Sequence, residues 1–139
     1  MKDKIFFDSN LIVYAFVKNE QRKKDITTSL LYDEDIHIII SIQVVNEFAN
    51  IMLYKKLMDT KHIPLIIEYI CYYCEPMQVD EKTIILAIDL HLKYKYSYYD
   101  CLILASALEN NCKQIYSEGM QHNQKIENKL LIVNPFKIL

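Results

Sequence analysis

The sequence has very little glycine and proline. Its 139 residues contain one glycine, at position 119, and three prolines, at positions 64, 76 and 135. Flexible linkers and low-complexity segments are richer in such residues, and no internal repeat is visible along the chain. We therefore expect a single domain over residues 1–139, without a linker to a second one.

The sequence also lacks a long apolar run and an excess of positive charge. No stretch approaches the roughly 18 unbroken apolar residues of a membrane span, which predicts a soluble, cytoplasmic protein with no membrane association. The net charge is -2, so a polyanionic partner would have to be met by local clusters such as Arg22-Lys23-Lys24, Lys55-Lys56 or the lysines at 93 and 95. Solvated helix faces explain these clusters equally well.

The four cysteines do not form the pattern of a zinc site. Cys71 and Cys74 have a suitable spacing, but the second half of such a site is missing, because Cys101 and Cys112 are eleven residues apart in apolar helical contexts. Buried, reduced thiols of a cytosolic protein explain these cysteines better than zinc does.

Short β-branched or aromatic runs alternate along the chain with longer helical patterns, and 52% of the residues are hydrophobic, enough for a sizeable core. Strands are predicted at 4–7, 36–40, 77–79, 114–116 and 131–133, and helices at about 11–17, 22–32, 42–56, 60–74, 81–94 and 97–110. This alternation is typical of a parallel sheet with helices on both faces. The predicted fold class is α/β.

Several predicted helices carry recognisable start signals. Ser9 or Asn10 is the expected cap of the first helix. Ser41 is the expected cap of the helix at 42–56, and Asp80 is the expected cap of the helix at 81–94. Pro64 is tolerated because it falls in a first turn. In the helix after Asp80, one face carries Ile84, Ile85, Ile88 and Leu92.

Three acidic residues lie at a strand end or near helix starts, positions that a parallel α/β sheet brings to one edge. Asp8 directly follows the apolar run Ile5-Phe6-Phe7, Glu47 lies in the apolar first half of a helix, and Asp100 lies at the start of another helix. Ligands of parallel sheets bind at the carboxyl ends of the strands. Each acid alone also has an ordinary explanation, as a helix cap, a solvent-facing position or a capping box with Ser97, but these explanations do not account for the three together.

Carboxylates gathered without lysine or arginine partners repel one another, and the usual resolution is a hard cation bound through oxygen, Mg²⁺ or Mn²⁺. Such an ion activates water and stabilises the charge of an in-line displacement at a phosphodiester. The pattern therefore favours Asp8, Glu47 and Asp100 as the acids of a metal-dependent phosphodiester hydrolysis.

Four motifs, in order, resemble those of the VapC-type toxins of the PIN-domain family. They are Phe7-Asp8-Ser9-Asn10, residues 41–48 around Glu47, residues 97–107 around Asp100, and residues 117–122. The resemblance spans nearly the whole chain. It implies a PIN-like three-layer fold with a central parallel sheet flanked by helices, and a Mg²⁺- or Mn²⁺-dependent endoribonuclease that acts as the toxin of a toxin–antitoxin pair. It also implies a homodimer and neutralisation by a small cognate antitoxin.

Carried over residue by residue, the resemblance assigns the metal to Asp8 and Asp100. Glu47 would complete the catalytic trio and bind the ion directly or through water. Asn10 and Ser117 match positions that support the pocket by hydrogen bonds.

One position departs from the family pattern, because Gly119 stands where a fourth acid is usual. Glu118 is one residue early, so we keep it only as a candidate supporting residue of the pocket. Gly119 is expected to adopt backbone angles that an aspartate would not favour. The departure leaves open whether one or two metals bind and whether activity is full.

Other interpretations remain open at this stage. The missing acid supports a PIN-like module that binds RNA or an antitoxin without cutting. Two other acid-rich α/β classes are not favoured. A haloacid-type phosphatase would need an aspartate where this chain has Asn10. A receiver domain would need paired acids at the end of the first strand and a phosphoacceptor at the end of the central strand, and neither is present. The tyrosines around 72–73 and 94–99 could stack on RNA bases, but we expect them to line the core and a dimer face.

Overall fold

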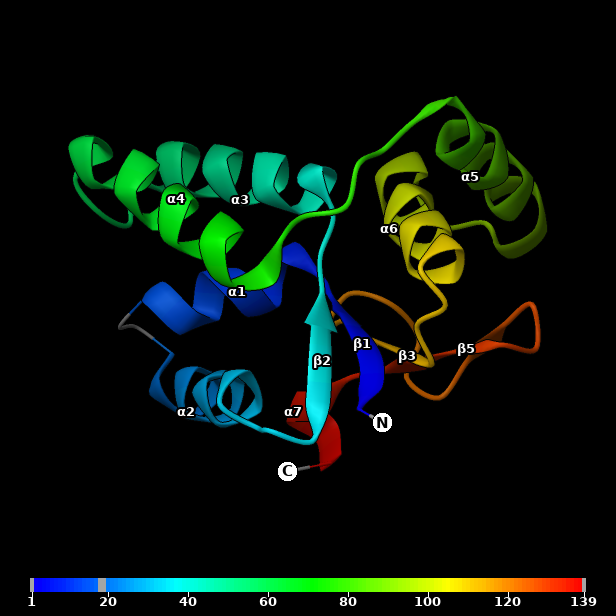
Figure 1. The fold of residues 1–139 in the computed structure, drawn as a ribbon, viewed down its shortest axis with the longest axis horizontal. Coiled ribbons are helices and arrows are strands. Elements are labelled where there is room, and N and C mark those ends of the chain that lie inside the picture. The colour runs from blue at the N-terminus through cyan, green and yellow to red at the C-terminus, as the bar shows by residue number, and fades with distance from the viewer. Residues whose placement is uncertain (1, 18–19, 139) are drawn as a thin grey trace.

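A five-stranded sheet forms the centre of the protein in the computed structural model, which describes residues 2–17 and 20–138 (Figure 1). The parallel strands β1, β2, β3 and β5 are joined by β4, which pairs antiparallel with β5, in the order β2-β1-β3-β5-β4. This sheet confirms the predicted α/β class with a central parallel sheet. The strand bounds are β1 (Asp3–Phe7), β2 (Ile36–Ile39), β3 (Gln114–Tyr116), β4 (Lys125–Ile126) and β5 (Leu130–Val133).

Helices gather on two sides of these strands in Figure 1. On one side lie α1 (Ser9–Phe16), α2 (Gln21–Leu31), α3 (Ile42–Lys55) and α4 (Ile63–Cys74). On the other side lie α5 (Glu81–Tyr94) and α6 (Tyr98–Glu109). The 3-10 turn η1 (Thr60–His62) precedes α4, and the short α7 (Pro135–Ile138) follows β5. Within residues 2–17 and 20–138, no helix is long and apolar enough to cross a membrane.

Strand β1 runs through the core. Its residues Ile5, Phe6 and Phe7 are buried, as expected for a central parallel strand covered on both faces. The chain passes from β1 to β2 on one side and later returns to β3 on the other side of β1. The carboxyl ends of β1 and β3 therefore mark the switch point at which parallel sheets bind ligands.

The helix starts agree with the predicted caps except at α1. The Ser41 hydroxyl accepts from the Val44 amide at 3.3 Å, and Asp80 forms a reciprocal capping box with Thr83. For α1 the predicted cap was wrong: Asp8 is the N-cap, with extended backbone angles, and its carboxylate accepts from the Ser9 amide at 2.6 Å. Aspartate is one of the best N-cap residues, so it can occupy this position itself.

Two elements, β4 and the short α7, were not predicted, and one predicted strand is absent. Of residues 77–79, only Met77 pairs, through a single bridge to Ser41. The two-residue β4 joins β5 through a tight turn in which Glu127 and Asn128 have φ values of 52° and 56°. Such a turn usually carries Asn-Gly or Asp-Gly, so this sequence contains no clear hairpin signal.

The predicted placement of the tyrosines along the core is confirmed in part, because Tyr94, Tyr96 and Tyr98 are half-buried and pack against the core. All eleven tyrosines lie within the described residues and none is buried; Tyr72 and Tyr73 on α4 and Tyr99 on α6 are exposed. The apolar face of α5 is also open to solvent, with exposed fractions of 43% for Ile84, 55% for Ile85, 47% for Ile88 and 64% for Leu92.

Candidate active site

The three predicted acids approach one another at the carboxyl ends of β1 and β3. Asp8 directly follows β1 and is buried, Glu47 is half-buried on α3, and Asp100 is half-buried in the first turn of α6. Burial, followed by the charge of Asp8, raises the pKa of Asp100. Burial and the charges of Asp8 and Asp100 raise the pKa of Glu47. The three carboxylates are thus close enough to repel one another.

Asp8 is held by hydrogen bonds to both of its carboxylate oxygens. The Ser117 hydroxyl, just beyond β3, donates to Asp8 Oδ2 at 2.7 Å, and the Ser9 amide donates to Oδ1 at 2.6 Å. Burial raises the pKa of Asp8, while the hydrogen bonds from Ser117 and Ser9 oppose this rise. Ser117 therefore joins the ends of β1 and β3 at the switch point.

Ser9 is a site residue that the sequence did not reveal. Its hydroxyl lies 3.3 Å from Asp8 Oδ1 and 3.1 Å from Glu47 Oε2. The other oxygen of Glu47, Oε1, accepts from Gln43 Nε2 at 3.2 Å. A serine beside an acid at a helix start resembles an ordinary cap, and nothing in its spacing indicates a second carboxylate 38 residues away in sequence.

No cation of the described residues pairs with the three acids. Within residues 2–17 and 20–138, the ion pairs join Lys23 to Glu118, Lys61 to Asp59, Lys93 to Glu127 and Lys113 to Asp3. Across the same residues, no three His, Cys, Asp or Glu side chains are arranged closely enough to hold a metal ion between them. The acids therefore form a cluster of negative charge, but not a site with three direct ligands already in place.

Of the predicted supporting residues, Asn10 and Glu118 are not engaged with the acids. Asn10 is half-buried in the first turn of α1, and its side chain makes no hydrogen bond within the described ranges. Its supporting role stays a prediction.

Glu118 is bound by α1 and α2 instead. Its Oε1 accepts from the Tyr14 hydroxyl at 2.6 Å, and its Oε2 pairs with Lys23 Nζ at 2.5 Å. Lys23 Nζ also lies over the rings of Tyr14 and Phe136, at 5.0 and 5.5 Å from their centroids. Burial acts to raise the pKa of Glu118, but the hydrogen bonds from Lys23 and Tyr14 outweigh it and lower that pKa. Glu118 is therefore a structural ion-pair partner in this conformation.

The expectation about Gly119 was wrong. Its φ is not positive, and a Cβ atom there would meet no heavy atom outside Gly119 and its two chain neighbours within 4 Å. An aspartate at this position would therefore meet neither a steric obstacle nor an unfavourable backbone angle.

The four cysteines are free, with Cys101 and Cys112 buried and Cys71 and Cys74 half-buried. Burial, followed by the nearby Cys71, raises the pKa of Cys74 to about 11, and burial raises the pKa of Cys112 to about 12. The thiols of Cys74 and Cys112 are therefore protonated in the metal-free protein at neutral pH.

Comparisons with solved structures show the same fold in bacterial toxins. The Mycobacterium tuberculosis toxin VapC20, described as cleaving the sarcin–ricin loop, has a TM-score of 0.69 at 14% identity, covering 83% of this chain and 90% of that one. A toxin–antitoxin complex from Klebsiella pneumoniae has a TM-score of 0.69 at 14% identity, covering 94% and 97%. VapBC2 from Rickettsia felis, bound to a DNA fragment from its promoter, has a TM-score of 0.68 at 17% identity, covering 93% and 96%.

Sequence comparison gives the family. A search of curated proteins found no match. The family model of the PIN domain matches residues 5–125, a span that contains Asp8, Glu47, Asp100 and Ser117. The resemblance found in the sequence motifs is thereby confirmed, and the chain belongs to the PIN domain family.

Proposed function

We propose that this chain is a metal-dependent endoribonuclease that acts as the toxin of a toxin–antitoxin pair. The observation that carries the proposal is the cluster of Asp8, Glu47 and Asp100 at the switch point of the sheet, with raised pKa values and without an ion-pair partner among the described residues. The sarcin–ricin loop cleaving toxin among the structural neighbours supports RNA as the substrate. Because that substrate is RNA, the proposed place of action is the cytoplasm.

The donors fit Mg²⁺ or Mn²⁺, since they are carboxylates without sulfur or imidazole. Asp8 and Asp100 would hold the ion, and Glu47 would reach it through water, because three direct ligands are not in place. The ion, when bound, would activate water and neutralise charge on the scissile phosphate. Ser117 and Ser9 fix the Asp8 carboxylate, and the amino ends of α1 and α6 favour the phosphate through their dipoles.

Adding Mn²⁺ to the metal-free protein should raise its melting temperature. An ion that binds only the folded state stabilises it by about 2.7 kcal/mol at 100 times its dissociation constant. A thermal melt with and without millimolar Mn²⁺ measures this, and the Asp100→Asn variant should respond much less. A wild-type melt that does not move would contradict the proposed pocket.

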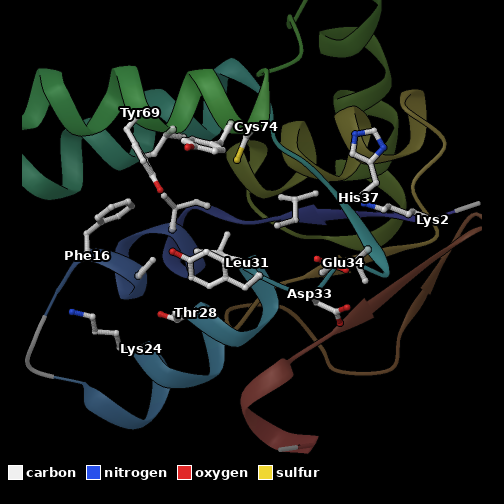
Figure 2. A pocket seen from close by; sticks show the side chains of 17 residues that line it. Lys2, Phe16, Lys24, Thr28, Leu31, Asp33, Glu34, His37, Tyr69 and Cys74 are labelled. Carbon is white, nitrogen blue, oxygen red and sulfur yellow. The ribbon is translucent and has the colours of Figure 1, made fainter.

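We propose that the antitoxin occupies the groove between α1, α2, α4 and β2, which has a cavity volume of about 980 Å³ (Figure 2). Its walls include Ile12, Phe16 and Ile70, and charged residues of both signs lie at its edge, among them Lys24 and Glu34. An apolar groove with a charged rim suits the apolar face of a helical peptide. The toxin–antitoxin complexes among the structural neighbours support a partner of this class.

Replacing the groove residue Tyr73 with alanine should weaken antitoxin binding about 30-fold, since exposed tyrosines at interface centres are worth about 2 kcal/mol or more. Tyr54, which is 83% exposed on α3 and does not line the groove, is the matched control. Binding to the cognate antitoxin can be measured by calorimetry. Equal affinities for Tyr73→Ala and Tyr54→Ala would rule out this groove.

The exposed apolar face of α5, formed by Ile84, Ile85, Ile88 and Leu92, supports a homodimer through this helix. A glutamate at Ile88 would be desolvated in such an interface, so we expect Ile88→Glu to be monomeric in sedimentation experiments. The exposed Leu53 on α3 is the control position. A wild-type monomer, or a dimer that tolerates Ile88→Glu, would refute this interface.

The engagement of Glu118 by Lys23, together with the missing acid at Gly119, favours a second candidate function. In that case the chain binds RNA or an antitoxin without cutting RNA. Metal binding separates the two, because a binding module of this kind needs no Mn²⁺ at Asp8 and Asp100.

A further inference from the structure

Ser9 and Gln43 hold the Glu47 carboxylate from its two sides. Ser9 Oγ lies 3.1 Å from Glu47 Oε2, and Gln43 Nε2 donates to Glu47 Oε1 at 3.2 Å. We propose that these two side chains are positioning residues that fix Glu47 for its contact with metal-bound water. This inference rests on the proposed function and assigns roles to two residues outside the acidic trio.

The positions of Ser9 and Gln43 follow from their places on α1 and α3. Ser9 is 4% exposed and follows Asp8 in the first turn of α1. Gln43 lies four residues before Glu47 in α3, and side chains at this spacing share a helix face. The two helices pack against each other, which brings Ser9 to the side of Glu47 opposite Gln43.

Glu47 needs such support because electrostatics acts against its position. Burial, followed by the charges of Asp8 and Asp100, raises its pKa, so all three disfavour a carboxylate there. No ion pair within the described residues compensates for them. A free glutamate side chain would relieve the repulsion by rotating toward solvent. The hydrogen bonds from Ser9 and Gln43 oppose this rotation.

Ser9 also couples Glu47 to the first metal ligand. Its hydroxyl lies 3.3 Å from Asp8 Oδ1, and because a hydroxyl has one proton it donates to one carboxylate at a time. Asp8 keeps its bonds from the Ser9 amide and from Ser117 without the hydroxyl. The Ser9 hydroxyl can therefore donate its proton to Glu47 while Asp8 binds a cation.

The test compares Ser9→Ala and Gln43→Met with Ser9→Thr, which retains the hydroxyl, and with Asn46→Ala, an exposed neighbour on α3. The readouts are the Mn²⁺ dissociation constant from calorimetry, the melting temperature, and kcat and KM for a single-stranded RNA. Groups that orient metal ligands are typically worth 10- to 100-fold. We expect Ser9→Ala and Gln43→Met each to weaken Mn²⁺ about tenfold and to lower kcat with little change in KM. Ser9→Thr should recover most of the Mn²⁺ affinity that Ser9→Ala loses, and Asn46→Ala should resemble the wild type.

A double mutant shows whether the effect passes through Glu47. In a Glu47→Gln background, Gln43→Met should cause no further loss of Mn²⁺ affinity, because the carboxylate that it positions is gone. Gln43→Met affects a half-buried side chain, so this arm remains informative if Ser9→Ala fails to fold. Wild-type Mn²⁺ affinity in Gln43→Met, or equal losses in both backgrounds, would overturn the positioning role. A wild type that binds no Mn²⁺ would refute the proposed function, and the positioning role with it.

Discussion

Replacing Asp8 or Asp100 with asparagine should abolish RNA cleavage while leaving the protein folded. A metal ion stabilises a phosphodiester transition state by several kcal/mol, and each 1.4 kcal/mol is worth a factor of ten, so the loss of a ligand should lower kcat/KM by about 100-fold or more. Asparagine remains a good N-cap for α1 at position 8. Cleavage of a labelled RNA, together with circular dichroism of each variant, tests both parts of the expectation.

The stability of these variants should follow from the raised pKa values. Burial raises the pKa of Asp8, Glu47 and Asp100, so the folded metal-free protein binds these protons more tightly than the unfolded chain does. The free energy of unfolding then falls as pH rises from about 4 through the raised values, and this destabilisation is complete above them. Asp100→Asn should therefore melt at or above the wild-type temperature at pH 7. Unfolding of both variants would mean that the acids act only as structural caps.

Replacing Gly119 with aspartate should raise Mn²⁺ affinity and cleavage about tenfold, an effect of roughly 1.4 kcal/mol. The substitution would supply the acid that the family pattern has at this position. The backbone permits it, because φ is not positive and a Cβ atom there would meet no heavy atom outside Gly119 and its two chain neighbours within 4 Å. Gly119→Asn is the matched control, since it adds the same volume without the charge. Equal activities of Gly119→Asp and Gly119→Asn would show that the position does not face the metal.

Glu118→Gln is the complementary test. Since Glu118 pairs with Lys23 and Tyr14, neutralising it should lower stability and leave Mn²⁺ affinity nearly unchanged. A marked loss of Mn²⁺ affinity would mean instead that Glu118 has taken over the missing role, in which case Gly119→Asp would add little.

Much of the fold could be predicted from local patterns. The apolar run before Asp8, the capping residues Ser41 and Asp80, and the run at 131–133 each carry a signal that is complete within a few residues. The hairpin at 125–130 could not be predicted. Its first strand, β4, is only two residues long, and its turn lacks the usual Asn-Gly or Asp-Gly pair, so neither part leaves a recognisable pattern in the sequence. The cap of α1 was misplaced because aspartate, serine and asparagine stand in succession and all cap helices well.

The site was harder to predict because its contacts are long-range. The sequence spacing of Ser9 and Glu47 does not predict the hydrogen bond between their side chains. Likewise, the ion pair between Lys23 and Glu118 forms only because α2 packs near the end of β3. The apolar stripe on α5 shows the same limit. Ile84, Ile85, Ile88 and Leu92 have the same helical spacing whether they face their own core or a partner.

The most direct test of the central claim is cleavage of a single-stranded RNA by the wild-type protein, first stripped of metal with a chelator and then supplied with Mn²⁺. We expect no cleavage before the addition and cleavage after it, at a weak rate because three acids hold a single ion. Failure of millimolar Mn²⁺ to produce cleavage in wild-type protein and in Gly119→Asp, while the cognate antitoxin still binds, would contradict the nuclease assignment and favour the binding module.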